Sequence, residues 1–194
     1  MMNENVKIVE LVIDEETGVD AVALVDRPAI EREWLAFNEE GTYKFKVENE
    51  ERRIVSGPLM VADLPIYRVD QYGGEYYAIF RKDTIEKIVH KFMQEGRTNA
   101  VNLMHESSMI PEGVYMFESF IIDSSRGINT PDGFKALPDG SWFGSYKVEN
   151  DEVWQQVKEG TFKGFSVEGM FKPLEKGEKP MDLVDAIIEI INGK

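Results

Sequence analysis

The chain has 194 residues, with 22 basic and 36 acidic side chains, a formal charge of −14 and no cysteine. This length fits one domain with a single core, and the lack of cysteine excludes disulfides, thiolate nucleophiles and cysteine-based zinc sites. The acidic balance, without a block of Lys or Arg, argues against nucleic acid as a partner. No apolar run has the length of a membrane span, and the first residues do not read as an export signal, so we expect a cytoplasmic protein with no membrane partner.

The N-terminal part, residues 1–53, predicts a hairpin or an arm. Two apolar runs at 6–13 and 19–25 flank the turn-like segment DEETG and indicate a β-hairpin at the start of the chain. The charge-rich remainder contains an alternating stretch at 43–47 that is typical of an exposed strand. The main domain is expected to extend to residue 180.

The rest of the chain predicts strands interrupted by helices. Asp83 is expected to cap a helix over 84–95. The apolar face of this helix is formed by Ile85, Ile88, Val89, Phe92 and Met93. A shorter capped helix is expected in NDEVWQQVKEG, and an amphipathic one over 181–194, which could dock on the core or on another subunit. Four strand-like segments separate the helices, and the long connection at 123–140 is of a kind that often carries function.

Ser166 is the first candidate nucleophile. It lies in GFSVEGMF, where alternation places Ser166 and Glu168 on one face of a strand and Phe165 and Val167 on the other, core-facing side. A strand held by its apolar face presents a hydroxyl rigidly. The spacing Gly-x-Ser-x-x-Gly, with no helix directly after it, disfavours the nucleophile elbow of the α/β-hydrolases. A small structural serine between glycines fits the same pattern.

A serine nucleophile normally needs a base, and the chain has two histidines. His90 lies off the apolar face of the predicted helix, as a solvated surface residue would. His105 ends the strand-like run AVNLMHES where a loop begins, a common location for reactive groups, although a hydrogen-bonded structural histidine fits as well. Glu118, in a strand expected to form a hairpin with the strand of His105, is the candidate third member of the site. Glu168 is the alternative.

A family resemblance is carried by four ordered segments: VDAVALVDRPAIEREWLAF, VNLMHES, VYMFESFIID and DEVWQQVKEGTFKGFSVEGMF. Together they resemble the XkdF-like phage serine proteases, a branch of the phage prohead (capsid maturation) proteases, over about residues 6–171. These proteases are considered similar to herpesvirus assemblin. The resemblance therefore implies an α+β fold with a small, mainly antiparallel β-barrel and flanking helices, with residues 1–180 as the protease-like domain and 181–194 as a C-terminal helix.

The resemblance also assigns roles: Ser166 becomes the nucleophile and His105 the general base. No histidine follows His105, unlike in assemblin, so Glu118, Glu168 or no third group assists them. The implied function is a serine endopeptidase without cofactor or metal that cleaves phage scaffold and major capsid precursors, and could cleave itself, inside the assembling prohead in the host cytoplasm. The comparison with assemblin also allows a homodimer. Two alternatives stay open: a non-enzymatic head-assembly protein with the same fold and an inactive site, and an acidic binding module whose C-terminal helix recruits a partner.

Overall fold

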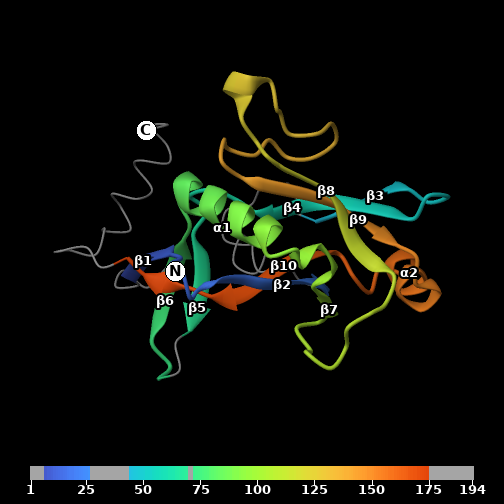
Figure 1. Cartoon of the computed structure of the whole chain (residues 1–194), viewed down its shortest axis with the longest axis horizontal. Coiled ribbons are helices and arrows are strands. Elements are labelled where there is room, and N and C mark those ends of the chain that lie inside the picture. The colour runs from blue at the N-terminus through green and yellow to red at the C-terminus, as the bar shows by residue number, and fades with distance from the viewer. Residues whose placement is uncertain (1–6, 27–43, 70–71, 175–194) are drawn as a thin grey trace, which may run out of the picture.

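The computed structural model describes residues 7–26, 44–69 and 72–174, and shows an α+β arrangement dominated by strands (Figure 1). The elements in chain order are β1 (Lys7–Val12), β2 (Gly18–Val25), β3 (Lys46–Asn49), β4 (Ile54–Met60), β5 (Ile66–Val69), β6 (Glu75–Ile79), α1 (Lys82–Gln94), the short helix η3 (Arg97–Asn99), β7 (Val101–Leu103), β8 (Val114–Ile121), the short helix η4 (Ser124–Arg126), β9 (Trp142–Val148), α2 (Asp151–Lys158), β10 (Gly164–Met170) and β11 (Lys172–Pro173). The helix predicted over 181–194 lies outside the described residues. No helix in the described ranges has both the length and the apolar character needed to cross a membrane.

The described strands form three sheets, with the orders β11-β1-β6-β5, β10-β2-β7 and β3-β4-β9-β8. The third sheet is antiparallel throughout, whereas the first contains the parallel pair β1–β6 and the second the parallel pair β2–β7. The α+β class is therefore confirmed. The closed barrel that the resemblance implied is not formed by these strands, because each sheet ends in edge strands that do not pair with one another.

The two N-terminal strands form where predicted, but the predicted hairpin between them is wrong. Strand β1 pairs with β6 and β11, while β2 pairs with β10 and β7. The corner between them is a turn in which Asp14 Oδ1 accepts hydrogen bonds from the backbone N–H of Glu16 and Thr17, at 3.0 and 2.9 Å. A hydrogen bond from Lys172, followed by one from Thr17, holds the pKa of Asp14 well below its usual range. This corner sends the chain into a second sheet and makes β2 its central strand.

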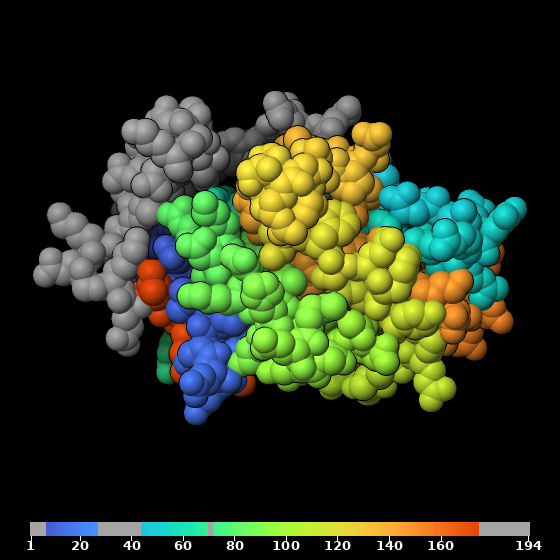
Figure 2. Space-filling view, turned by 45° about the horizontal axis from the view of Figure 1, so that its top comes forward, coloured from blue at the N-terminus to red at the C-terminus, as the bar shows by residue number. Residues whose placement is uncertain are grey.

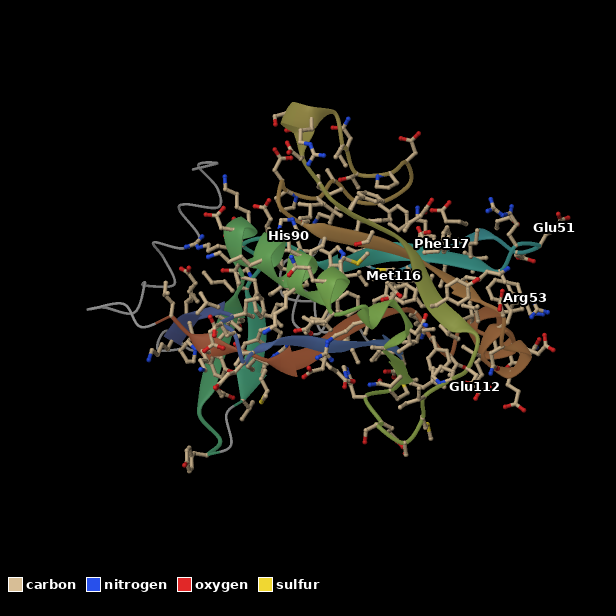
Figure 3. The ribbon with its side chains drawn as sticks, in the orientation of Figure 1. Glu51, Arg53, His90, Glu112, Met116 and Phe117 are labelled. Carbon is tan, nitrogen blue, oxygen red and sulfur yellow. The ribbon has the colours of Figure 1, made fainter. Side chains whose placement is uncertain are left out.

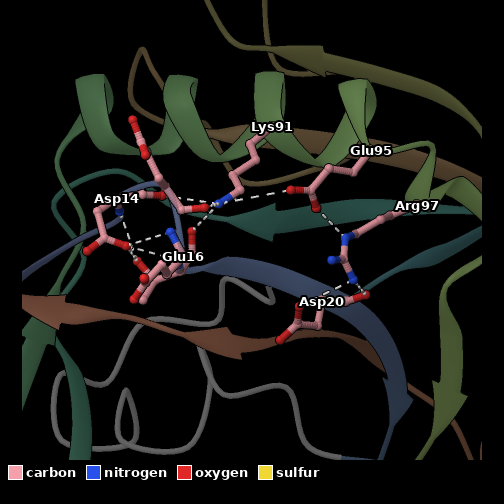
Figure 4. A network of polar contacts seen from close by, with 8 residues as sticks. Asp14, Glu16, Asp20, Lys91, Glu95 and Arg97 are labelled. Atoms are coloured by element: carbon pink, nitrogen blue, oxygen red, sulfur yellow. Dashed lines mark hydrogen bonds and ion pairs between the residues drawn. The ribbon is translucent and has the colours of Figure 1, made fainter.

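Lys91 ties helix α1 to this corner (Figure 4). Its Nζ donates to the backbone carbonyl oxygens of Asp14, Glu15 and Thr17, at 3.1, 2.6 and 2.8 Å. In the space-filling view, α1 and the β1–β2 corner adjoin on one face of the molecule (Figure 2). Three carbonyls that the turn leaves without strand partners are thus satisfied by one ammonium group, which stabilises the entry into β2.

Replacing Lys91 by methionine is expected to lower the free energy of unfolding by about 1–3 kcal/mol, because hydrogen bonds from a charged donor are lost while the apolar stem is kept. Urea unfolding followed by circular dichroism measures the change. Lys87→Met is the matched control, since Lys87 is an exposed residue of the same helix. Equal stability losses for the two variants would contradict a structural role for the Lys91 contacts.

The core packs α1 and the sheets together through aromatic side chains. Phe92 of α1 meets Trp142 of β9 with ring centroids 5.2 Å apart, and Tyr146 of β9 meets Phe165 of β10 at 4.8 Å. Burial raises the pKa of the Tyr146 hydroxyl well above its ordinary value. The ring pair Tyr146–Phe165 joins the sheet of β9 to the sheet of β10, so the apolar face of β10 is fixed against the core, as the alternation in its sequence predicted.

The two predicted helices that fall within the described residues are present, with one correction at the start of α1. Arg81 is the N-cap residue and makes no side-chain cap, while Asp83 lies within the first turn. A carboxylate in the first turn stabilises the helix by interacting with the helix dipole. The acidic residue that the sequence predicts as the N-cap therefore lies two residues after the actual N-cap. Helix α2 begins at Asn150, whose side chain accepts a hydrogen bond from the backbone N–H of Val153 at 3.0 Å.

Candidate active site

The sheet β10-β2-β7 places the candidate residues on one face. In its register Ser166 of β10 lies opposite Ala23 of β2, and Ala23 lies opposite Asn102 of β7. Glu168 lies opposite Ala21, two residues along. Residues in register share a face of the sheet. The polar side chains of the outer strands are therefore separated only by the small side chains of two alanines of β2. The central strand therefore leaves space on this face for a polar site.

A strained turn at the end of β7 presents His105. Met104 and His105 both have positive φ, 54° and 64°, and the backbone N–H of Glu106 donates to the carbonyl of Leu103 at 3.0 Å, which describes a type I′ turn. Neither central residue is glycine, so this conformation costs free energy. The backbone N–H of Met104 donates to the carbonyl of Leu24 at 3.0 Å and anchors the turn to β2. Strain of this kind is concentrated at functional sites, and here it projects a half-exposed imidazole from a fixed strand end.

Glu168 and Asn102 orient the imidazole. Oε1 of Glu168 lies 2.5 Å from Nδ1 of His105, and the same oxygen accepts a hydrogen bond from Nδ2 of Asn102 at 2.9 Å. Asn102 is 4% exposed and therefore holds the carboxylate from a buried position. With Nδ1 turned toward Glu168, Nε2 is the ring nitrogen that remains for another partner. Sequence reasoning missed Asn102, although an asparagine inside the apolar run AVNLM is a signal of a buried hydrogen bond.

A bulge in β2 lies beside Glu168: Glu168 pairs with Ala21 and Gly169 with Val19, so Asp20 is the extra residue. The register with β2 shifts between Glu168 and Gly169. A Cβ atom at Gly169 would lie 1.9 Å from the carbonyl oxygen of Gly18, so no side chain fits there. Because the neighbouring atoms belong to the backbone, they cannot move aside easily. The glycine thus permits a close strand approach at the residue next to the carboxylate that contacts His105.

Ser166, His105 and Glu168 all line one pocket of about 530 Å³. Ser166 is 4% exposed, and its hydroxyl makes no hydrogen bond with His105 among the described residues. The residues that line the rest of the pocket are apolar, with the exception of Arg68. The structure therefore brings together the predicted nucleophile, the predicted base and the alternative acid, in a cavity of a size suited to ligand binding.

Glu118 is not brought to this pocket. Its strand β8 pairs with β9, with Glu118 opposite Ser145, and the expected hairpin with the strand of His105 is wrong. The Glu118 side chain is exposed. The two residues before it on β8, Met116 and Phe117, are labelled in Figure 3. His90 is exposed on α1, as predicted. Within the described ranges, no group of three His, Asp or Glu side chains is arranged to hold a metal ion.

A serine, an imidazole and a carboxylate around one pocket are the groups that serine hydrolases use. The profile of the family described as "Putative phage serine protease XkdF" matches residues 43–175, and the chain belongs to this family. The chain is 26% identical over 174 residues to the phage-like element PBSX protein XkdF of Bacillus subtilis (strain 168), covering 84% of this chain and 56% of that protein. It is 27% identical over 168 residues to the uncharacterized protein YqbD of the same strain, covering 82% of this chain and 47% of that one. The chain thus spans about half the length of these curated relatives. No solved structure matches it.

Proposed function

We propose that the chain is a serine endopeptidase in which Ser166 is the nucleophile, His105 the general base and Glu168 the acid that orients the base. The observation that carries this proposal is the 2.5 Å contact between Glu168 and His105 in the pocket that Ser166 also lines. A carboxylate bound to Nδ1 fixes the imidazole tautomer and stabilises the imidazolium that forms during acyl transfer. Membership of a phage serine protease family supports the same reaction.

The reaction proceeds in two halves. Ser166 Oγ attacks the peptide carbonyl carbon while its proton passes to Nε2 of His105, and a tetrahedral intermediate forms. His105 then donates that proton to the leaving amine, the C–N bond breaks, and an acyl ester remains on Ser166. Water, deprotonated by His105, attacks the ester and releases the new carboxyl end with the serine hydroxyl restored. Glu168 stays ionised throughout and balances the charge on the imidazolium.

In the proposed reaction, Nε2 of His105 has to come within hydrogen-bond reach of the Ser166 hydroxyl. The imidazole is 44% exposed and is held at Nδ1 but not at Nε2 by the described residues, so it has freedom to rotate about its contact with Glu168. Catalytic hydrogen bonds are often longer before substrate binds and tighten in the substrate complex. A peptide that fills the pocket and excludes water would favour the closed arrangement.

The substrates proposed for this reaction are scaffold and major capsid precursors of a phage, cleaved inside the assembling prohead. Two findings support them: the family is a phage family, and one relative carries the name of a phage-like element protein. The acidic surface charge fits a protein that works among other proteins rather than on nucleic acid. A homodimer is proposed as well, by the likeness to assemblin.

A fluorophosphonate probe tests the proposed nucleophile. The full-length chain is incubated with the probe, digested, and analysed by mass spectrometry, and the expected adduct lies on Ser166 because only an activated serine reacts at an appreciable rate. A heat-denatured sample should not be labelled, which separates site activation from general reactivity. A folded chain with no adduct, or with an adduct only on another serine, would contradict the proposal and favour a non-enzymatic head-assembly protein.

A further inference from the structure

The free edge of β10 borders the pocket. Five consecutive residues, 165–169, line it, although their side chains alternate between the two faces of the strand. A cavity that contacts successive residues of one strand must run along the edge of that strand rather than over one face. In the sheet order β10 is an outer strand, paired with β2 on one side only within the described residues.

The register shows which backbone groups face this edge. The backbone N–H of Val22 donates to the carbonyl oxygen of Ala100 at 2.9 Å, and the carbonyl oxygen of Leu24 accepts from the backbone N–H of Met104 at 3.0 Å. The backbone groups of these two β2 residues therefore point toward the side of β7. Val167 lies opposite Val22, and Phe165 lies opposite Leu24. In an antiparallel ladder such pairs are not hydrogen-bonded to each other, so the N–H and C=O groups of Phe165 and Val167 point away from β2.

These groups flank Ser166 on the side of the pocket. At the start of the same edge, the carbonyl of Lys163 accepts a hydrogen bond from the backbone N–H of Phe45 at 3.0 Å, so this edge already binds one main-chain donor. An extended peptide can add to the next positions along it by main-chain hydrogen bonds. Its alternate side chains then project toward the pocket.

The pocket walls opposite the site are apolar. They come from β1, β4, β5 and the ends of β6 and β10, and include Leu11, Leu59, Met60, Ile66, Phe80 and Phe171. Phe80 and Phe171 meet edge to face, with ring centroids 4.8 Å apart, and form one continuous aromatic wall. Among the described residues, and apart from the site residues, Arg68 is the one charged residue of the lining, and it donates to the carbonyl of Tyr67 at 3.1 Å. A charged side chain entering the part of the cavity formed by these apolar residues would lose its hydration without a matching partner.

We propose that this pocket selects a large apolar side chain, such as Leu, Ile, Met or Phe, at one fixed position of an extended peptide that lies along β10 beside Ser166. The inference rests on the proposed peptidase function and adds its substrate class. The gain from burying such a side chain corresponds to about a 10-fold to 100-fold preference in kcat/KM over a charged residue at the same position.

A library of peptides derived from a denatured bacterial proteome tests the preference. The full-length protein is incubated with the library, and cleavage sites are mapped by mass spectrometry. Large apolar residues are expected to be enriched about 10-fold or more over Asp, Glu and Lys at one position relative to the cut. Cleavage that depends on Ser166 but shows no such enrichment would overturn the substrate class and leave the peptidase function standing.

A binding measurement separates the two proposals further. The Ser166→Ala variant is titrated by calorimetry with two extended peptides. They have the same sequence except at one position, which is Leu in one peptide and Asp in the other. This is the position preferred in the library, or the central position when the library shows no preference. Tighter binding of the Leu peptide supports the apolar pocket, whether or not the library is cut. An uncut library would contradict the peptidase activity but not the pocket. Equal binding of the two peptides overturns the pocket assignment.

The shape of the preference is tested with Ile66→Ala, which removes bulk from the wall of the pocket. The preference is expected to shift from aliphatic toward larger aromatic side chains. Ile121→Ala is the matched control, because Ile121 lies on β8 outside the pocket and the same atoms are deleted. An identical cleavage profile for wild type and both variants would overturn the proposed pocket.

Discussion

Ser166→Ala is expected to reduce kcat/KM for peptide cleavage by at least about 10³-fold while leaving the fold intact. In the proposed mechanism the Ser166 hydroxyl forms the acyl ester, and no other described residue that lines the pocket carries a hydroxyl. His105→Ala should lose a similar amount, and the double variant little more, because nucleophile and base act as a unit. Initial rates on a peptide identified as a substrate, with urea unfolding of each variant, provide the measurement.

Ser145→Ala is the matched control for the nucleophile. Ser145 is also a buried strand serine, but it lies on β9 and accepts a hydrogen bond of 2.8 Å from the Ser56 hydroxyl. This variant is expected to lose some stability, because the Ser56 hydroxyl is left buried without its partner, and to keep its activity. If Ser166→Ala cleaved peptides at the wild-type rate, the assignment of the nucleophile would be wrong whatever the control showed.

Glu168→Gln is expected to lower kcat by about 10²-fold to 10⁴-fold with a smaller effect on KM. The amide retains the shape of the side chain but cannot balance the charge of the imidazolium, and it allows the other tautomer of His105. The chemical step suffers most because this charge develops in the transition state. Rates under single-turnover conditions, compared with binding of an uncleaved peptide, separate the two effects.

Glu118→Gln is the control that decides between the two acids. Its side chain is exposed on β8, in a different sheet from His105, so this variant should retain wild-type rates and stability. The opposite pattern, with activity lost in Glu118→Gln and kept in Glu168→Gln, would mean that the contact between Glu168 and His105 plays no part in catalysis.

The local elements were predictable from sequence because their signals are local. Apolar periodicity located α1 to within two residues, and the capping Asn150 marked the start of α2. The alternation around Ser166 predicted a strand with the serine and Glu168 on one face, and both line the same pocket. Patterns of this kind depend on a few neighbouring residues, and tertiary contacts did not override them.

Strand pairing could not be read in the same way. Two adjacent apolar runs joined by a short turn predict a hairpin, yet Lys91 and the Asp14 turn direct β1 and β2 into separate sheets. The choice of Glu118 rested on a second such hairpin, between the strands of His105 and Glu118, that does not form. Pairing between strands distant in sequence depends on packing of the whole domain, which no local pattern contains.

The turn that carries His105 was also out of reach of sequence rules. A type I′ turn is normally signalled by asparagine or glycine, and this one has methionine and histidine at its central positions. The conformation persists because two backbone N–H groups of the turn are hydrogen-bonded: that of Met104 to the carbonyl of Leu24, and that of Glu106 to the carbonyl of Leu103. Departures from local propensity of this kind are expected at functional sites, which is consistent with the role proposed for His105.

The central place of β2 limits how far the domain can be shortened. The family profile starts at residue 43, well after β2 ends at Val25, yet this strand is the spacer that holds the serine-bearing and histidine-bearing segments at a fixed separation. A protein trimmed to the matched region would retain every proposed catalytic side chain and lose the scaffold between them. The minimal catalytic unit is therefore larger than the region that family comparison delimits.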